Sequence, residues 1–142
     1  MSAVVESFER GEVDVATFDH RAHVEVAFHF LATFPLLEAL PRFCVALQRL
    51  VQAHGAEGKF HATLSVALLL LIRDRMRDGE SWPEFAAREA AFIARGIAPV
   101  HDHYPRAQLD CPEARAAFEL PAARMPTPGG TCSPRSRSGG GR

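Results

Sequence analysis

The chain has 142 residues, 47% of them hydrophobic, which predicts one folded domain with a single core and excludes a wholly disordered chain. Its formal net charge of -1 gives no basic field for a phosphate backbone, so no nucleic-acid partner is expected. The three cysteines are scattered and form no Cys-x-x-Cys pair, which favours reduced thiols and a cytoplasmic protein.

Helix-forming residues dominate, and β-branched residues are sparse after Val26. This mixture predicts an all-α compact bundle of four main helices with a short C-terminal helix. Residues 1–121 are expected to form a single helical domain. Residues 122–142, rich in Pro, Gly, Ser and Arg and without apolar periodicity, are expected to form a disordered tail.

No membrane partner is expected. The first ten residues are acidic and polar, where an export signal would be basic and then apolar. The longest apolar run, residues 64–72, is far shorter than the roughly 20 residues that cross a bilayer. It therefore indicates a helix buried in protein.

The first predicted helix begins near Thr17 or Asp19, both good N-caps, and ends before Pro35. Successive residues of a helix turn by about 100°, which gathers an apolar stripe on one face. The stripe contains His20, His23, Val24, Ala27, Phe30 and Leu31. Two histidines therefore lie among apolar residues.

The second predicted helix runs from Leu36 to about His54 and stops at Gly55. Pro41 complicates this helix, because its ring would clash with the carbonyl of Leu37. Either the helix kinks there, or a short turn precedes a helix that begins at Pro41.

The third predicted helix covers about residues 60–78, and its middle is apolar nearly all round, which indicates the central element of the bundle. The fourth has a capping box, with Ser81 as the cap and Glu84 three residues on, and ends at Gly96. A short fifth helix begins near residue 110.

Three histidines form a candidate metal site: His20, His23 and His61. Residues three apart on a helix are neighbours, so His20 and His23 can bind one ion, and His61 from a facing helix would complete the set. Imidazole suits Zn, Fe, Cu or Ni. We expect a divalent metal, Zn or Fe, with one open position where a bound water could act as nucleophile or base on a substrate that the sequence does not identify.

Alternatives stay open. Buried histidines are often hydrogen-bonded structural residues, and these could cap helices or pair with carboxylates. The chain could be a non-enzymatic interaction module or a homodimer joined through its apolar helices, because the third helix is apolar nearly all round. A haem or another planar cofactor could bind between the histidines and phenylalanines of the first helix. His101 and His103 are interpreted as surface residues of a loop.

Three segments carry a resemblance: FDHRAHVEVAFHFL, GKFHATLS and HYPRAQLDCPEARAAFELP. They resemble a family of small, uncharacterised bacterial helical proteins over residues 8–121. The matching positions are His20, His23, Lys59, Phe60, His61, Thr63, Tyr104, Ala114, Arg115 and Phe118. The resemblance implies a helical fold and the same histidines but no reaction.

This chain departs from the family pattern at several positions. The family's Glu after the later histidine is Ala62 here, and the Ser after the aromatic residue is Pro105. The acidic residue that follows the last proline in the family is Ala122 here. If that Glu is a ligand or a general base in the family, this chain lacks it.

Overall fold

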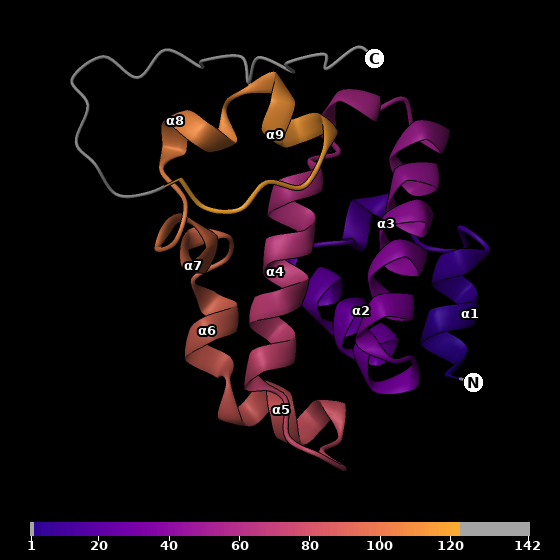
Figure 1. The fold of residues 1–142 in the computed structure, drawn as a ribbon. Helices are drawn as coiled ribbons and strands as arrows, with labels where there is room; N and C mark the ends of the chain where they lie inside the picture. Colours follow the sequence, from indigo (N-terminus) through magenta and orange to yellow (C-terminus); the bar gives the residue numbers. More distant parts are fainter. Residues whose placement is uncertain (1, 123–142) are drawn as a thin grey trace, which may run out of the picture.

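The computed structural model describes residues 2–122, except for the side chain of residue 57. Within this part the chain is all-α, as predicted, and contains no strand (Figure 1). The helices are α1 (Ala3–Glu9), α2 (His20–Thr33), α3 (Leu36–Ala53), α4 (Ala62–Arg75), α5 (Trp82–Arg88), α6 (Ala90–Ala94), α7 (Ala98–His101), α8 (Arg106–Leu109) and α9 (Pro112–Ala116), with 3-10 turns η1 (Val15–Thr17) and η2 (Glu57–Lys59). Apart from Ala122, the predicted tail lies outside the described residues.

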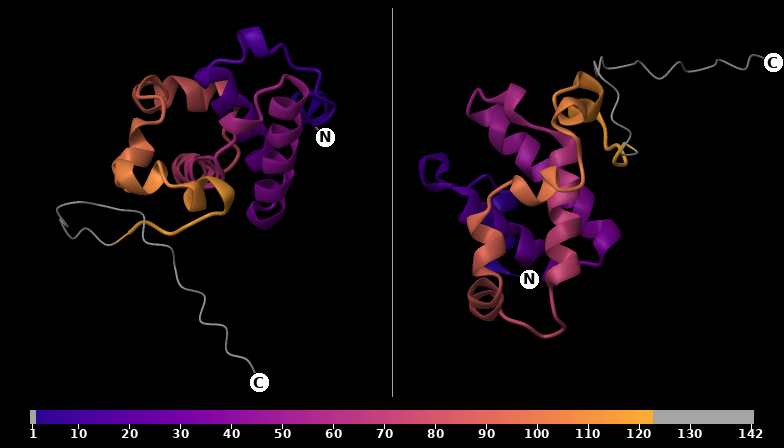
Figure 2. Two further views of the ribbon diagram at one scale, coloured as in Figure 1. Left: turned by 90° about the horizontal axis from the view of Figure 1, so that it is seen from above. Right: turned by 90° about the vertical axis from the view of Figure 1, so that its left-hand side faces the viewer.

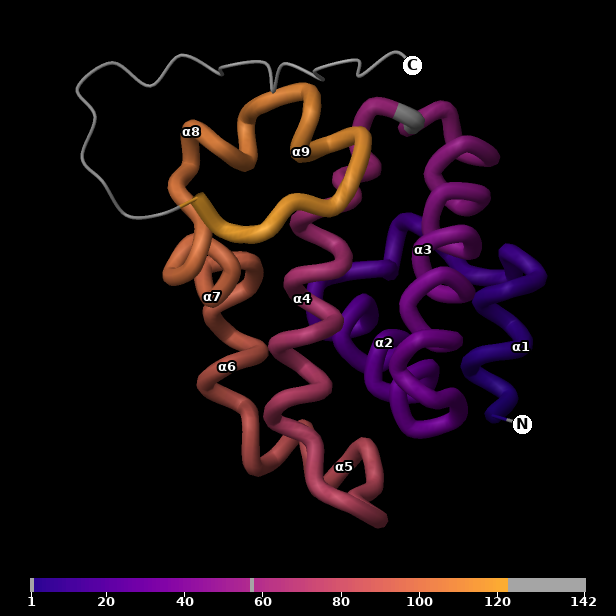
Figure 3. Tube along the Cα trace, in the orientation of Figure 1, coloured from indigo at the N-terminus to yellow at the C-terminus, as the bar shows by residue number. Residues whose placement is uncertain are grey.

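Helix α4 is the central element, as its apolar sequence predicts. It contacts α2 and α3 on one side and α7 and α9 on the other, an arrangement that can be followed in Figures 1 and 3. Residues 106–122, which include α8 and α9, are called the last described segment. Figure 2 shows this segment, in orange, at one end of the bundle. The largest fully buried side chains include Phe8, Phe30, Phe43, Phe85, Leu68, Leu69 and Ile72. No helix in residues 2–122 combines the length and apolar character that crossing a bilayer requires.

Helices α2 and α3 begin where local signals predict. Asp19 caps α2, and its Oδ1 accepts a hydrogen bond from the amide of Ala22 at 2.8 Å. Helix α3 begins at Leu36 and continues through Pro41, so it does not start at the proline. Leu37 and Pro41 lie on the exposed face of α3. Because Pro41 has no amide hydrogen, the carbonyl of Leu37 lacks its helical donor, and water can hydrogen-bond to it there.

Helix α1 was not predicted, and its N-cap residue, Ser2, makes no capping side-chain bond. Tertiary contacts stabilise this short helix instead. Phe8 is buried against Phe43, with ring centroids 5.5 Å apart. Glu9 accepts two hydrogen bonds from Arg42 of α3, at 2.8 and 3.1 Å.

The predicted fourth helix is wrong as a single element. Its capping box at Ser81 is confirmed, but the helix breaks at Glu89 into α5 and α6. Arg88 and Glu89 at the break bind the end of α4: Arg88 donates to the carbonyl of Arg75, and Glu89 accepts from the Arg75 guanidinium. These tertiary bonds favour the backbone geometry of the break.

The C-terminal end of the described chain differs from the prediction in two respects. His101 is the last residue of α7 and not part of a loop. The short fifth helix expected to begin near residue 110 is confirmed as α9, which starts at Pro112, whereas α8, just before it, was not predicted. Each of α7, α8 and α9 has only four or five residues, so their packing against α4 and one another determines their shape.

Candidate functional site

His20 and His23 lie together at the start of α2. Their ring centroids are 6.4 Å apart. The Nε2 atom of each ring is shut off from solvent and has no hydrogen-bond partner within the described residues. A buried polar atom without a partner costs roughly 1–3 kcal/mol, so this pair is the least satisfied polar group at the start of α2.

Aromatic side chains form the surroundings of His23. Its ring stacks on Phe18 at 5.7 Å between centroids and lies 5.4 Å from Phe43. Phe8 packs against both of these phenylalanines. His23 therefore faces an apolar wall, and that wall offers its ring no hydrogen-bonding group.

Burial keeps both imidazoles of the pair neutral. Burial, with a smaller contribution from the nearby His20, lowers the pKa of His23 from 6.5 to about 4. Burial also lowers the pKa of His20, although the carboxylate of Asp19 opposes that shift. At neutral pH each ring thus has a nitrogen lone pair for a ligand, and no proton has to be displaced.

His61 is in a different state, because both of its ring nitrogens are engaged within the chain. It is the N-cap of α4, and its Nδ1 accepts a hydrogen bond from the amide of Leu64 at 3.1 Å. Its Nε2 therefore carries the proton and donates it to the carbonyl of Leu109 at 2.7 Å. Neither nitrogen is left for a metal ion unless one of these bonds breaks.

The structure brings together two of the three predicted ligands. In residues 2–122 no group of three or more His, Cys, Asp or Glu side chains is placed to hold one metal ion. His20 and His23 remain as a pair, and His61 serves the start of α4.

A hydrogen-bonded clasp joins the start of α4 to the last described segment. We use this name for the bonds that His61 and Thr63 make to that segment. Thr63, which is fully buried, donates to the carbonyl of Ala117 and accepts from the amide of Glu119, both at 3.1 Å. The sequence showed Thr63 only as a position in the resemblance and gave it no role.

Further bonds support the clasp from both sides. The hydroxyl of Tyr104 donates to the carbonyl of Glu119 at 2.6 Å. Arg115 of α9 donates to the carbonyl of Gly58, ahead of α4, at 3.0 Å. Several polar residues of the resemblance therefore have structural partners.

His101 differs from the loop residue that was expected. Its Nδ1 is buried without a hydrogen-bond partner in the described part of the chain. His103, two residues further on, is exposed. The two residues therefore do not share one environment, which gives no support to a His-x-His metal site.

Comparisons with family models, with curated proteins and with solved structures find no match to this chain. The resemblance to a bacterial helical family therefore stays a prediction.

Proposed function

We propose that the protein binds one divalent transition-metal ion through the paired imidazoles of His20 and His23. The observation that carries the proposal is the pair of buried Nε2 atoms, neighbours on one helix, that lack any hydrogen-bond partner in the described chain. A metal ion would satisfy both atoms at once. His61 is left out of the proposed site, because its two nitrogens are already bonded.

The ring separation is compatible with binding after a small movement. With Zn–N bonds of about 2.0–2.1 Å, two imidazoles on a tetrahedral ion have centroids about 5 Å apart. The observed 6.4 Å thus requires an approach of about 1 Å, which side-chain rotation can supply. Water or a small-molecule ligand would complete the coordination, since two protein ligands leave positions open.

The donor set indicates which ions to test. Neutral imidazoles bind Cu²⁺, Ni²⁺ and Zn²⁺ more tightly than Mn²⁺ or Fe²⁺. Zn²⁺ is the first probe, because it has no redox chemistry and accepts varied geometry. Mg²⁺ and Ca²⁺ prefer oxygen ligands and serve as negative controls.

The test uses the full chain purified without an affinity tag. Elemental analysis and titration calorimetry with Zn²⁺ should give one ion per chain. His20→Ala and His23→Ala should each weaken binding at least tenfold. His54→Ala is the matched control, because His54 is exposed at the end of α3 and should leave binding unchanged.

Two results would overturn the proposal. One is the absence of stoichiometric binding by the unaltered chain at neutral pH. The other is Zn²⁺ binding that survives both His20→Ala and His23→Ala in protein that remains folded by circular dichroism. An absorbance spectrum of the same sample tests the haem alternative, which requires visible bands.

A further inference from the structure

Helix α3 carries a line of apolar side chains on the face that points away from the core. Leu37 is 85% exposed and Val45 is 43% exposed, with the exposed Pro41 between them. We call these three residues the α3 stripe. Their spacing of four residues places them along about 12 Å of one helix face.

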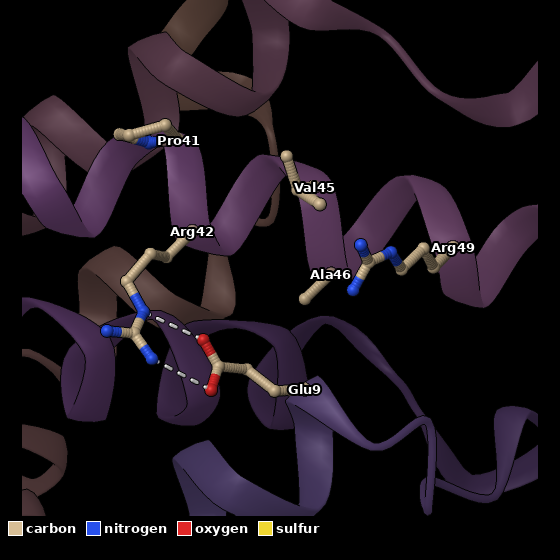
Figure 4. Close-up of a pocket in the computed structure, with 6 residues that line it drawn as sticks. All are labelled: Glu9, Pro41, Arg42, Val45, Ala46 and Arg49. Atoms are coloured by element: carbon tan, nitrogen blue, oxygen red, sulfur yellow. Dashed lines mark hydrogen bonds and ion pairs between the residues drawn. The ribbon is translucent and has the colours of Figure 1, made fainter.

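A hollow of about 370 Å³ lies beside the stripe, and Figure 4 shows its lining. Pro41, Val45 and Ala46 give it an apolar surface. Arg42 lies at one end, where its guanidinium is bound to Glu9 of α1.

Arg49 lines the same hollow, and its guanidinium lies near Ala46 (Figure 4). No ion pair or hydrogen bond joins the Arg49 side chain to another described residue. The stripe is therefore flanked by a cation that lacks a counter-ion in the described chain.

Charge is ordered along this face. Glu38 lies near the start of α3, where it accepts a hydrogen bond from Arg42 at 3.1 Å; because Arg42 also binds Glu9, two carboxylates share one guanidinium there and leave this end net negative. Arg49 lies about 16 Å further along, on the same side as the stripe. In an antiparallel pair of α3 helices with a two-fold axis near Phe43, Glu38 of one copy opposes Arg49 of the other. The same axis places Pro41 against Val45. The face is therefore complementary to itself, as a two-fold interface requires.

We infer that the α3 stripe is the interface of a homodimer in which α3 packs antiparallel against α3 of a second copy. Glu38 and Arg49 form an ion pair at each end of this interface. The pairing is weak, because one helix pair buries less than the 1,200–2,000 Å² typical of stable complexes. The inference is independent of the proposed metal site. It assigns the homodimer that the sequence left open to α3, because the more apolar α4 is packed inside the bundle.

The first experiment measures sedimentation equilibrium of the full chain from low micromolar to several hundred micromolar. We expect a reversible monomer–dimer equilibrium within this range. Leu37→Gln should weaken dimerisation at least tenfold. Leu120→Gln is the matched control, because Leu120 is 71% exposed on the last described segment, away from α3, and should leave the equilibrium unchanged.

The second experiment tests the antiparallel register with charge reversals. Glu38→Lys and Arg49→Glu should each weaken self-association, because each places like charges opposite one another at both ends. A mixture of the two variants should form a heterodimer, in which both end pairs become attractive. Both residues are exposed. Glu38→Lys removes the Arg42–Glu38 ion pair of its own helix, but Arg42 keeps its two bonds to Glu9.

Three outcomes would overturn the inference. The first is that the unaltered chain remains monomeric at several hundred micromolar. The second is that Leu37→Gln dimerises as tightly as the unaltered chain. The third is that the mixed charge variants, each folded by circular dichroism, do not associate with one another.

Discussion

The imidazole of His61 donates a hydrogen bond to the carbonyl of Leu109, 48 positions further along the chain, at 2.7 Å. The same ring caps α4 through Leu64, so one side chain both starts the central helix and binds the last described segment to it. A residue that the pattern favoured as a metal ligand has a structural role that uses both of its nitrogens.

Changing His61 should separate these two roles. His61→Asn can still cap α4 but is too short to reach Leu109, so the buried carbonyl loses its donor, at a cost of about 1–3 kcal/mol. His61→Ala loses the cap as well, which costs roughly a further 1 kcal/mol. Urea unfolding measures both changes.

His103→Ala serves as the control in this series, because His103 is exposed and such a substitution is expected to change stability by less than about 0.5 kcal/mol. If His61→Asn and His61→Ala are equally destabilised, the capping role is wrong. If neither variant is destabilised, the bond to Leu109 contributes nothing to the free energy of unfolding.

Thr63 provides a second test of the clasp. Thr63→Val keeps the shape of the side chain but leaves the carbonyl of Ala117 and the amide of Glu119 without their partner, so we expect a loss of about 1–3 kcal/mol. Thr63→Ser retains the hydroxyl and should lose only about 1 kcal/mol, for the missing methyl group.

Hydrogen exchange at the Glu119 amide distinguishes the clasp from a simple packing effect. In Thr63→Val this amide should exchange faster than in the unaltered chain, whereas in Thr63→Ser it should stay protected. Equal protection in the two variants would mean that Thr63 stabilises the protein by packing alone.

His23 should make stability depend on pH below neutrality. Its pKa is about 4 in the folded chain against 6.5 as the unperturbed value, so between these pH values the unfolded chain binds a proton that the folded chain does not. The contribution is fully present above pH 6.5 and is lost as the pH falls towards 4. The expected loss is on the order of 3 kcal/mol.

His23→Gln is the matched variant for this measurement, because the amide does not titrate in this range. Unfolding free energies at pH 7, 6, 5 and 4 should fall more steeply for the unaltered chain than for His23→Gln. Carboxylates such as Glu80, whose pKa is lowered by Arg88, contribute to both curves and cancel in the difference. Parallel curves would contradict the burial of a neutral His23.

Local signals in the sequence predicted the parts of the fold that local bonds determine. Asp19 caps α2, Ser81 and Glu84 cap α5, and the apolar run in α4 is buried at the centre. The break at Glu89 could not be predicted, since it depends on bonds to Arg75 from an element elsewhere in the chain.

In the candidate site too, local sequence predicted one part and missed the part that depends on distant residues. Helical periodicity alone placed His20 and His23 on one face, and the structure confirms that they are neighbours. Nothing in the sequence near His61 indicates a carbonyl partner 48 residues away. That partner depends on how the short helices α8 and α9 pack, which periodicity does not describe.

The clasp also has a consequence for the order of events during synthesis. A chain leaves the ribosome N-terminus first, and contacts between distant residues form late because they close long loops. The partners of Thr63 lie 54 and 56 residues downstream, so the beginning of α4 keeps unpaired polar groups until almost all of the described chain has emerged. A nascent chain arrested before Ala117 should therefore be more accessible to proteases and chaperones near Thr63 than one released after residue 122.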